Sequence, residues 1–167
     1  MAGSRLPKQL ALDTNLVLDL AEGQDFAHSF RELFQERLYT LSLPPTATLE
    51  LHENSLYAPA PQKRELARLA LLKLRSWGIR AFELSAVQHA IAERFAAKLG
   101  EKGLLPAEEF NDAAILAESS LEQIPLLVTS DKHLLDIDED ALVLAFNEAE
   151  LFPVRPVHPK RLLRALR

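Results

Sequence analysis

The sequence predicts an α/β protein in which helices cover both faces of a parallel sheet. Two observations support this fold class. Five short segments have the apolar or β-branched character of strands, and the longer segments between them have the apolar spacing of helices. Strands that alternate with helices form parallel sheets with helices on both faces. The chain of 167 residues, 48% of them apolar, is also long enough to bury a core without disulfides.

The first predicted strand is a short apolar run at residues 10–12 that ends on Asp13. A run of this kind, bounded by polar residues, is typical of a buried parallel strand. The fourth strand precedes Thr129, Ser130 and Asp131, so two strands lead into an aspartate. The other predicted strands cover residues 39–43 and 79–84 and, at an edge of the sheet, residues 152–157.

Proline, glycine and capping residues set the expected helix boundaries. Proline is tolerated in a first turn, Ser85 is a good N-cap, and Gly78 ends a helix that contains a leucine-rich stripe. The predicted helices cover residues 14–22, 25–38, 46–57, 61–78, 86–99, 106–123 and 139–149 and the segment after Pro159. The segment 139–149 is apolar without a clear period, so a strand is the alternative there. No repeat or linker divides the chain, and we expect one domain over residues 1–167.

The composition excludes several classes of protein. Without cysteine there is no disulfide framework, no cysteine-ligated metal and no cysteine nucleophile. No run of about 18 apolar residues occurs and an acid interrupts the N-terminal segment early, so we expect a soluble, cytoplasmic protein without membrane contact. The five histidines lack metalloprotease spacing, and no nucleophile elbow, phosphate-binding loop or dinucleotide fingerprint is present. A dehalogenase-like phosphatase would need a second aspartate where this chain has Asn15.

Four acidic residues stand out by their positions. Asp13 and Asp131 follow predicted strands, where parallel sheets bind ligands, although aspartate is also a common helix N-cap. Asp112 lies inside a predicted helix beside small apolar residues, a position that helix propensity disfavours. Glu50 lies inside another helix, and Glu53 on the same helix face is the alternative to it.

Convergence of these acids would dictate their chemistry. Two carboxylates about 5 Å apart repel by roughly 3 kcal/mol at an effective dielectric of 20. Four together therefore require protonation, basic partners or a divalent cation. Oxygen ligands favour Mg²⁺ or Mn²⁺ over zinc, and such an ion can activate water and neutralise charge on a phosphoryl oxygen. The sequence thus predicts metal-assisted phosphodiester hydrolysis.

The segments around the four acids resemble the PIN-domain ribonucleases, particularly the VapC-like toxin group. The resemblance rests on LALDTNLVLDL, TATLELHE, FNDAAILA and LLVTSDKHLL, in this order, over about residues 8 to 137. The ending VRPVHPKRLLRAL also looks like the family's last strand and short helix. The resemblance implies catalytic and metal-binding roles for four acids, Asp13, Glu50, Asp112 and Asp131. It also implies that Asn15 and Thr129 support the first and last of them.

The same resemblance implies a three-layer α/β/α sandwich around a mostly parallel sheet of about five strands. It implies a toxin that cleaves single-stranded RNA with Mg²⁺ or Mn²⁺, leaves 3′-hydroxyl and 5′-phosphate ends, forms a homodimer and is neutralised by an antitoxin protein. The alternative is a non-catalytic PIN-like module that binds RNA or protein. This chain departs from compact toxins in its longer stretch between Glu50 and Asp112 and in its acidic run at residues 136–140.

The net charge of −5 conceals a segregation of charge along the chain. Residues 59–80 hold six basic residues and one acid, and residues 151–167 hold five basic residues and no acid. Residues 101–150 hold 13 acids and two bases. Local patches rather than net charge decide whether a protein binds nucleic acid, although a solvated helix face is the alternative explanation. The candidate contacts to RNA or to a partner are Lys63, Arg64, Arg68, Lys73 and Arg75.

Overall fold

The computed structural model describes residues 8–166 and contains a five-stranded sheet in which every neighbouring pair is parallel. The strand order is β3-β2-β1-β4-β5. The strands are β1 (Gln9–Leu12), β2 (Thr40–Leu43), β3 (Ile79–Ala81), β4 (Leu126–Val128) and β5 (Arg155–Val157). The three consecutive residues at the end of β1 are all buried, which requires helices on both faces of the sheet. The predicted three-layer α/β/α fold is confirmed.

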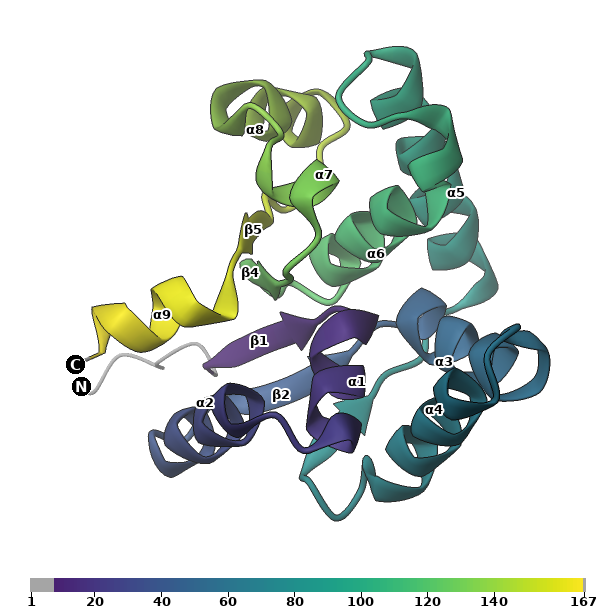
Figure 1. The fold of residues 1–167 in the computed structure, drawn as a ribbon. Helices are drawn as coiled ribbons and strands as arrows, with labels where there is room; N and C mark the ends of the chain where they lie inside the picture. Colours follow the sequence, from purple (N-terminus) through teal and green to yellow (C-terminus); the bar gives the residue numbers. More distant parts are fainter. Residues whose placement is uncertain (1–7, 167) are drawn as a thin grey trace.

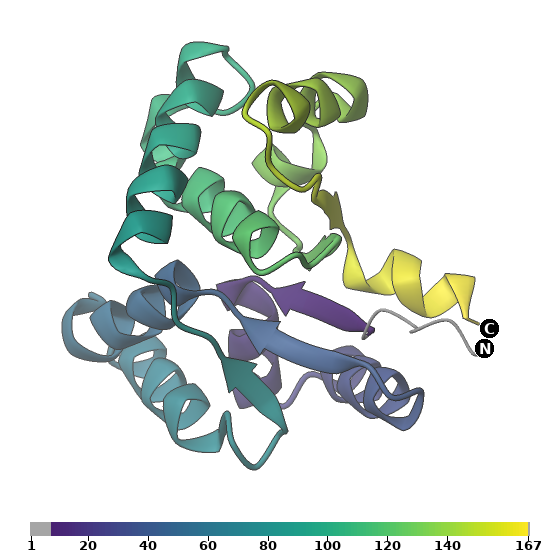
Figure 2. The same cartoon turned by 180° about the vertical axis from the view of Figure 1, so that it is seen from behind.

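Nine α-helices and one short 3₁₀-helix surround the sheet within residues 8–166. The helices of the first half are α1 (Thr14–Glu22), α2 (Asp25–Glu36), α3 (Pro45–Tyr57) and α4 (Pro61–Lys73). Those of the second half are α5 (Ala86–Glu101), η1 (Ala107–Glu109), α6 (Phe110–Leu121), α7 (Lys132–Leu135), α8 (Glu139–Glu148) and α9 (Pro159–Ala165). Figures 1 and 2 show α1 to α4 in the lower part of the view and α5 to α8 in the upper part. The strands β1 and β4 pair where the two groups meet (Figure 1).

The pairing of β1 with β4 creates one edge at which two strands end together. Leu12 is the register partner of Val128, and the backbone N–H of Asp13 donates to the carbonyl of Val128 at 2.9 Å. The residues that follow the two strands, Asp13 and Thr129, are therefore neighbours. This is the carboxyl edge of the sheet, where parallel folds bind their ligands.

Several boundaries differ from those expected. Helix α4 ends at Lys73 rather than at Gly78, and the chain then turns into β3 through a left-handed glycine with φ +72°. The third strand ends at Ala81 and the last one begins at Arg155, so both are shorter than expected. The helix expected from Pro106 is divided into η1 and α6, whereas the expected helix over 139–149 is present as α8.

The leucine-rich segment 66–74 contributes only part of its leucines to the core, Leu74 being buried and Leu71 packed against it. Leu72 is 76% exposed and Leu69 is also exposed, whereas Ala67 and Ala70 are buried. Helix α4 packs against α1 and α3, and small residues allow this close approach. Among residues 8–166, no helix combines the length and apolar character needed to cross a membrane.

Candidate metal centre

Asp13 is a buried carboxylate held by three neighbours at the carboxyl edge of the sheet. It is 4% exposed and caps α1, because its Oδ1 accepts from the backbone N–H of Thr14 at 2.7 Å. Its Oδ2 accepts from Thr129 Oγ1 at 2.7 Å and from Asn15 Nδ2 at 3.4 Å. Burial raises the pKa of Asp13, the bonds from Thr129 and Thr14 oppose this shift, and the charge of Asp131 adds to it. Asp13 thus has a fixed orientation and a charge that its surroundings only partly compensate.

Asp131 lies three residues after the end of β4 and directly before α7. Its Oδ1 accepts from the backbone N–H of His133 at 2.8 Å, so Asp131 is the N-cap of this short helix. Its own backbone N–H donates to Thr129 Oγ1 at 3.0 Å, and the backbone N–H of Ser130 donates to Asn15 Oδ1 at 3.4 Å. The two side chains expected to support the acids therefore connect the segment of Asp13 to that of Asp131.

Glu50 reaches the same region from α3. Its Oε2 accepts from Thr14 Oγ1 at 3.3 Å, and within the described residues its buried Oε1 has no hydrogen-bond partner. Burial, as the larger cause, and the charge of Asp13 together raise the pKa of Glu50 to about 7. The hydrogen bond from Thr14 opposes this shift to a smaller extent. Glu53 is exposed on the same helix. Of the two glutamates left open by the sequence, the structure places Glu50 beside Asp13.

Asp112 lies in the first turn of α6 rather than in mid-helix, because η1 occupies the residues that were expected to form the start of the helix. Asp112 is 8% exposed, and in the described part of the chain its Oδ2 has no hydrogen-bond partner. Burial raises the pKa of Asp112 well above its usual range, and the carboxylates of Glu109, Asp13 and Asp131 raise it further. The acids that raise the pKa of Asp112 therefore include one that follows β1 and one that precedes α7.

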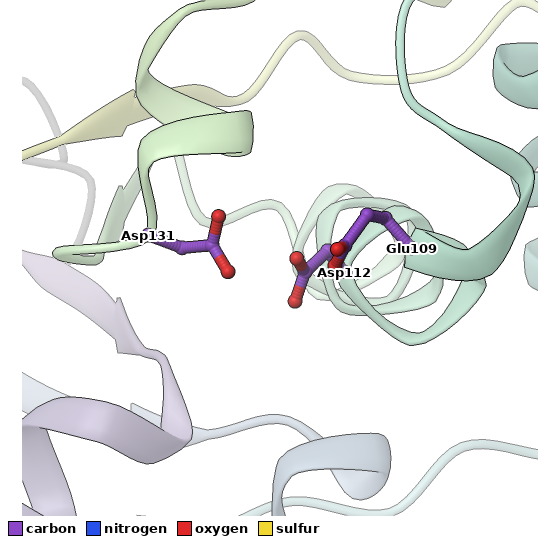
Figure 3. A group of neighbouring side chains, drawn as sticks. All are labelled: Glu109, Asp112 and Asp131. Carbon is purple, nitrogen blue, oxygen red and sulfur yellow. The ribbon is translucent and has the colours of Figure 1, made fainter.

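Glu109 is an acid of this region that the sequence did not single out. One carboxylate oxygen from each of Glu109, Asp112 and Asp131 lies within 4.8 Å of the others, and Figure 3 shows the three side chains turned toward a common space. His133 Nε2 lies 3.6 Å from Glu109 Oε1 on the outer side of this group. The available signal was its place three residues before Asp112, which puts both acids on one helical face.

The donor set fits a hard divalent cation. All the converging side-chain atoms are carboxylate oxygens, and in residues 8–166 none of the four predicted acids forms an ion pair with lysine or arginine. Two buried oxygens, on Glu50 and Asp112, also lack hydrogen-bond partners in the described part of the chain. Unpaired buried carboxylates destabilise a protein unless they are protonated or bind a cation, and oxygen ligands favour Mg²⁺ or Mn²⁺.

The five basic candidates of α4 and the following turn are not equivalent. Arg64 donates to the carbonyl oxygens of Ala58 and Pro59, so it closes the connection between α3 and α4. Arg68 pairs with Glu65 on the helix surface. Lys63, Lys73 and Arg75 are exposed.

The topology places Lys63 and Lys73 toward opposite edges of the sheet. Gln35 at the end of α2 donates to the carbonyl of Trp77 in the turn after α4. Helix α2 leads into the beginning of β2, and this turn leads into the beginning of β3, which is parallel to β2. The end of α4, with Lys73, therefore lies toward the edge opposite the acids. Lys63 is ten residues earlier, about 15 Å along the helix at 1.5 Å per residue, toward the edge of the acids.

Comparison with known proteins supports the same fold. No curated protein sequence matches the chain. Similar solved structures include VapBC2 from Rickettsia felis bound to a DNA fragment from their promoter (17% identity, TM-score 0.60, 90% of this chain and 98% of that chain). They also include VapBC-1 from nontypeable Haemophilus influenzae (12% identity, TM-score 0.58, 91% and 98%) and FitAcB from Neisseria gonorrhoeae (16% identity, TM-score 0.51, 90% and 97%). At these identities the similarity establishes the fold.

The family follows from the sequence itself. A family model described as the PIN domain matches residues 10–140, which include Asp13, Glu50, Asp112 and Asp131. This range covers most of the chain and every strand except β5 at the edge, although β1 begins one residue earlier. The chain therefore belongs to the PIN domain family.

Proposed function

We propose that this protein is an endoribonuclease that requires Mg²⁺ or Mn²⁺ and hydrolyses phosphodiester bonds of single-stranded RNA. The observation that carries the proposal is a group of three carboxylates, Glu109, Asp112 and Asp131, at one edge of the sheet in a chain of the PIN domain family. Thr129 links Asp131 to Asp13, and Thr14, which follows Asp13, donates to Glu50. The four predicted acids come from four separate segments, Asp13 and Asp112 are buried, and within the described residues one oxygen each of Glu50 and Asp112 has no hydrogen-bond partner. Such an arrangement stores unfavourable electrostatic energy that a bound cation would relieve.

The residues have separable roles in this proposal. Asp112, Asp131 and Asp13 would hold the cation, with Glu109 as an additional ligand. The bound ion would supply charge neutralisation at the phosphoryl oxygen and a lower pKa for the attacking water. Glu50 Oε1 has no hydrogen-bond partner among the described residues, and a pKa of about 7 suits it to accept a proton near neutral pH. Thr129 and Asn15 would hold Asp13 and Asp131 in fixed positions relative to each other.

We further propose that the protein is the toxin of a toxin–antitoxin pair. The support is the similarity of the fold, over 90–91% of this chain, to the VapBC2, VapBC-1 and FitAcB structures. An antitoxin protein would then be the partner, and a homodimer the expected assembly. The first half of α4, with Lys63, would contact the phosphate backbone of the RNA substrate.

An RNA-cleavage assay with matched variants tests the enzymatic proposal. Wild-type protein should cleave single-stranded RNA with Mn²⁺ or Mg²⁺ and not with EDTA, and Asp112→Asn should abolish cleavage. The control is Asp136→Asn, which changes an exposed acid of the run 136–140 and should retain full activity. Thermal unfolding gives a second measurement, because a ligand at about 100 times its Kd stabilises the folded state by about 2.7 kcal/mol.

Two results would contradict the proposal. Metal-independent cleavage that survives Asp112→Asn would identify a contaminant or another site. Equal stabilisation of wild type and Asp112→Asn by Mn²⁺, without cleavage by either, would favour a non-catalytic module that binds RNA or protein.

A further inference from the structure

Glu118 is a buried carboxylate of α6 outside the group of converging acids. It is 3% exposed, and its two oxygens accept from the same residue of α3. Oε1 accepts from the backbone N–H of Thr46 at 2.9 Å, and Oε2 accepts from Thr46 Oγ1 at 2.6 Å. Burial raises the pKa of Glu118, and the two bonds from Thr46 and the charge of His89 oppose this shift. A buried acid is stable only with such compensation.

These bonds replace a missing cap at the start of α3. Pro44 occupies the N-cap position and makes no side-chain cap, and Pro45 at the first helical position has no N–H. The N–H of Thr46 is thus the first free amide of the helix, and a helix of this length needs a partner for it. Glu118 supplies that partner from another helix, with the negative charge that a helix N-terminus favours.

The bond lies one helical turn from Glu50. Thr46 and Glu50 are four residues apart and share a face of α3, whereas Glu118 is six residues after Asp112 on α6. Helices α3 and α6 also pack against each other. The carboxylate of Glu118 therefore joins the helix that carries Glu50 to the helix that carries Asp112.

We propose that Glu118 is a positioning residue that holds α3 against α6, and that it thereby sets the placement of Glu50 relative to Asp112. This inference rests on the proposed metal-dependent function. Glu118 would not touch the cation or the RNA; it would act through Thr46 and the first turn of α3. Groups that orient ligands in this way affect metal affinity as well as stability.

The principal variant is Glu118→Gln, whose side chain keeps its shape but can accept only one of the two bonds. Mn²⁺ affinity by calorimetry, kcat and KM are measured below the unfolding temperature of every variant. We expect Mn²⁺ to bind about tenfold more weakly, which is the lower end of the effect of removing an orienting partner. We expect kcat to fall while KM for RNA stays within about twofold, because RNA contacts are untouched.

Two controls show whether an effect of Glu118→Gln on Mn²⁺ affinity comes from the position of α3, from the lost charge or from a change in folding. Glu122→Gln removes the carboxylate that pairs with Arg80 just after the end of α6, and it should leave Mn²⁺ affinity unchanged. Thr46→Val removes the hydroxyl bond without changing charge and should weaken Mn²⁺ binding in the same direction as Glu118→Gln, whereas Thr46→Ser should restore it.

The outcomes are distinguishable. A lower melting temperature for Glu118→Gln with unchanged Mn²⁺ affinity and kcat would make Glu118 a structural residue only and overturn the inference. If Glu122→Gln weakens Mn²⁺ binding as much as Glu118→Gln does, the effect is one of overall charge rather than of position, and this result would also overturn the inference. If wild-type protein shows no Mn²⁺ binding that Asp112→Asn removes, the proposed function itself fails, and the inference fails with it.

Discussion

Thr129 Oγ1 donates a 2.7 Å hydrogen bond to Asp13 Oδ2, and both residues directly follow paired parallel strands. The same hydroxyl oxygen accepts from the backbone N–H of Asp131 at 3.0 Å. A hydroxyl can donate and accept at once, so one side chain fixes two acids that are distant in the sequence. Thr129 is fully buried, and water does not compete for these bonds.

Replacing Thr129 with valine should therefore destabilise the protein without changing the shape of the site. Thr129→Val removes the donor to Asp13, whose charge then remains buried with less compensation. A lost bond to a buried charged group costs about 1–3 kcal/mol, and this loss should appear in urea unfolding with EDTA at neutral pH. Thr129→Ser keeps the hydroxyl and is the control. A change below about 0.5 kcal/mol in the valine variant would show that this bond contributes little.

The raised pKa of Glu50 predicts a pH dependence of stability. Its pKa is about 7 in the folded protein against an ordinary value of 4.5, so the folded state binds the proton more tightly than the unfolded state. The contribution of Glu50 to stability is therefore complete below pH 4.5 and is lost as the pH rises through about 7. Without metal, the melting temperature of the wild type should fall between about pH 5 and about pH 8.

Glu50→Gln tests this assignment, because it removes the titrating group. Its melting temperature should fall less steeply over the same range, and a residual slope should remain because the pKa values of Asp13 and Asp112 are also raised. Glu53→Gln changes an exposed acid on the same helix and should keep the wild-type slope. Identical slopes for wild type and Glu50→Gln would contradict the buried, raised-pKa state of Glu50.

The sheet could be predicted from the sequence, and Asp13 and Asp131 could be singled out as candidates, because both features have local signals. Asp13 and Asp131 end short apolar segments, and buried parallel strands must be apolar on both faces. The resemblance to one family then connected these acids to Glu50 and Asp112. These signals are local or ordered along the chain, so they can be read without knowledge of tertiary contacts.

The rest depends on tertiary packing and could not be predicted in that way. The spacing of Glu109 and Asp112 was a local signal, but the placement of Glu109 in a separate 3₁₀ turn before α6 was not, because helix boundaries are poorly encoded locally. The Glu118–Thr46 bond joins residues that are far apart in sequence, and neither residue has an unusual sequence context. The exposure of Leu72 reflects the close packing of α4 through alanine, which hydrophobic spacing alone does not predict.

Glu109→Gln should weaken metal binding without lowering the stability of the metal-free protein. Glu109 places a carboxylate beside Asp112 and Asp131, so if it is the proposed ligand, its loss should weaken Mn²⁺ binding on the order of tenfold. Without metal, the same change removes a carboxylate that raises the pKa of Asp112, and the melting temperature should stay equal or rise. The neighbouring exposed Glu108→Gln is the control. Unchanged Mn²⁺ affinity in Glu109→Gln would exclude Glu109 from the metal site.

The two ends of α4 should differ in their contribution to RNA binding. Binding of single-stranded RNA is measured over a series of salt concentrations in an Asp112→Asn background, which prevents cleavage. Each phosphate contact contributes about 0.7 to the slope of log affinity against log salt concentration, because binding releases counterions. Lys63→Gln should lower the slope by about this amount, since Lys63 lies toward the edge of the sheet that carries the acids.

Lys73→Gln is the matched control for Lys63→Gln, because it removes the same side chain from the opposite end of the same helix. Lys73 is followed by the turn bonded to Gln35, at the edge of the sheet away from Asp13, so its removal should leave the slope unchanged. An equal decrease in both variants would indicate diffuse attraction to the whole basic segment. If neither variant lowers the slope, α4 is not part of the RNA interface. Its exposed Leu69 and Leu72, with the surrounding charges, would then be a candidate surface for a protein partner.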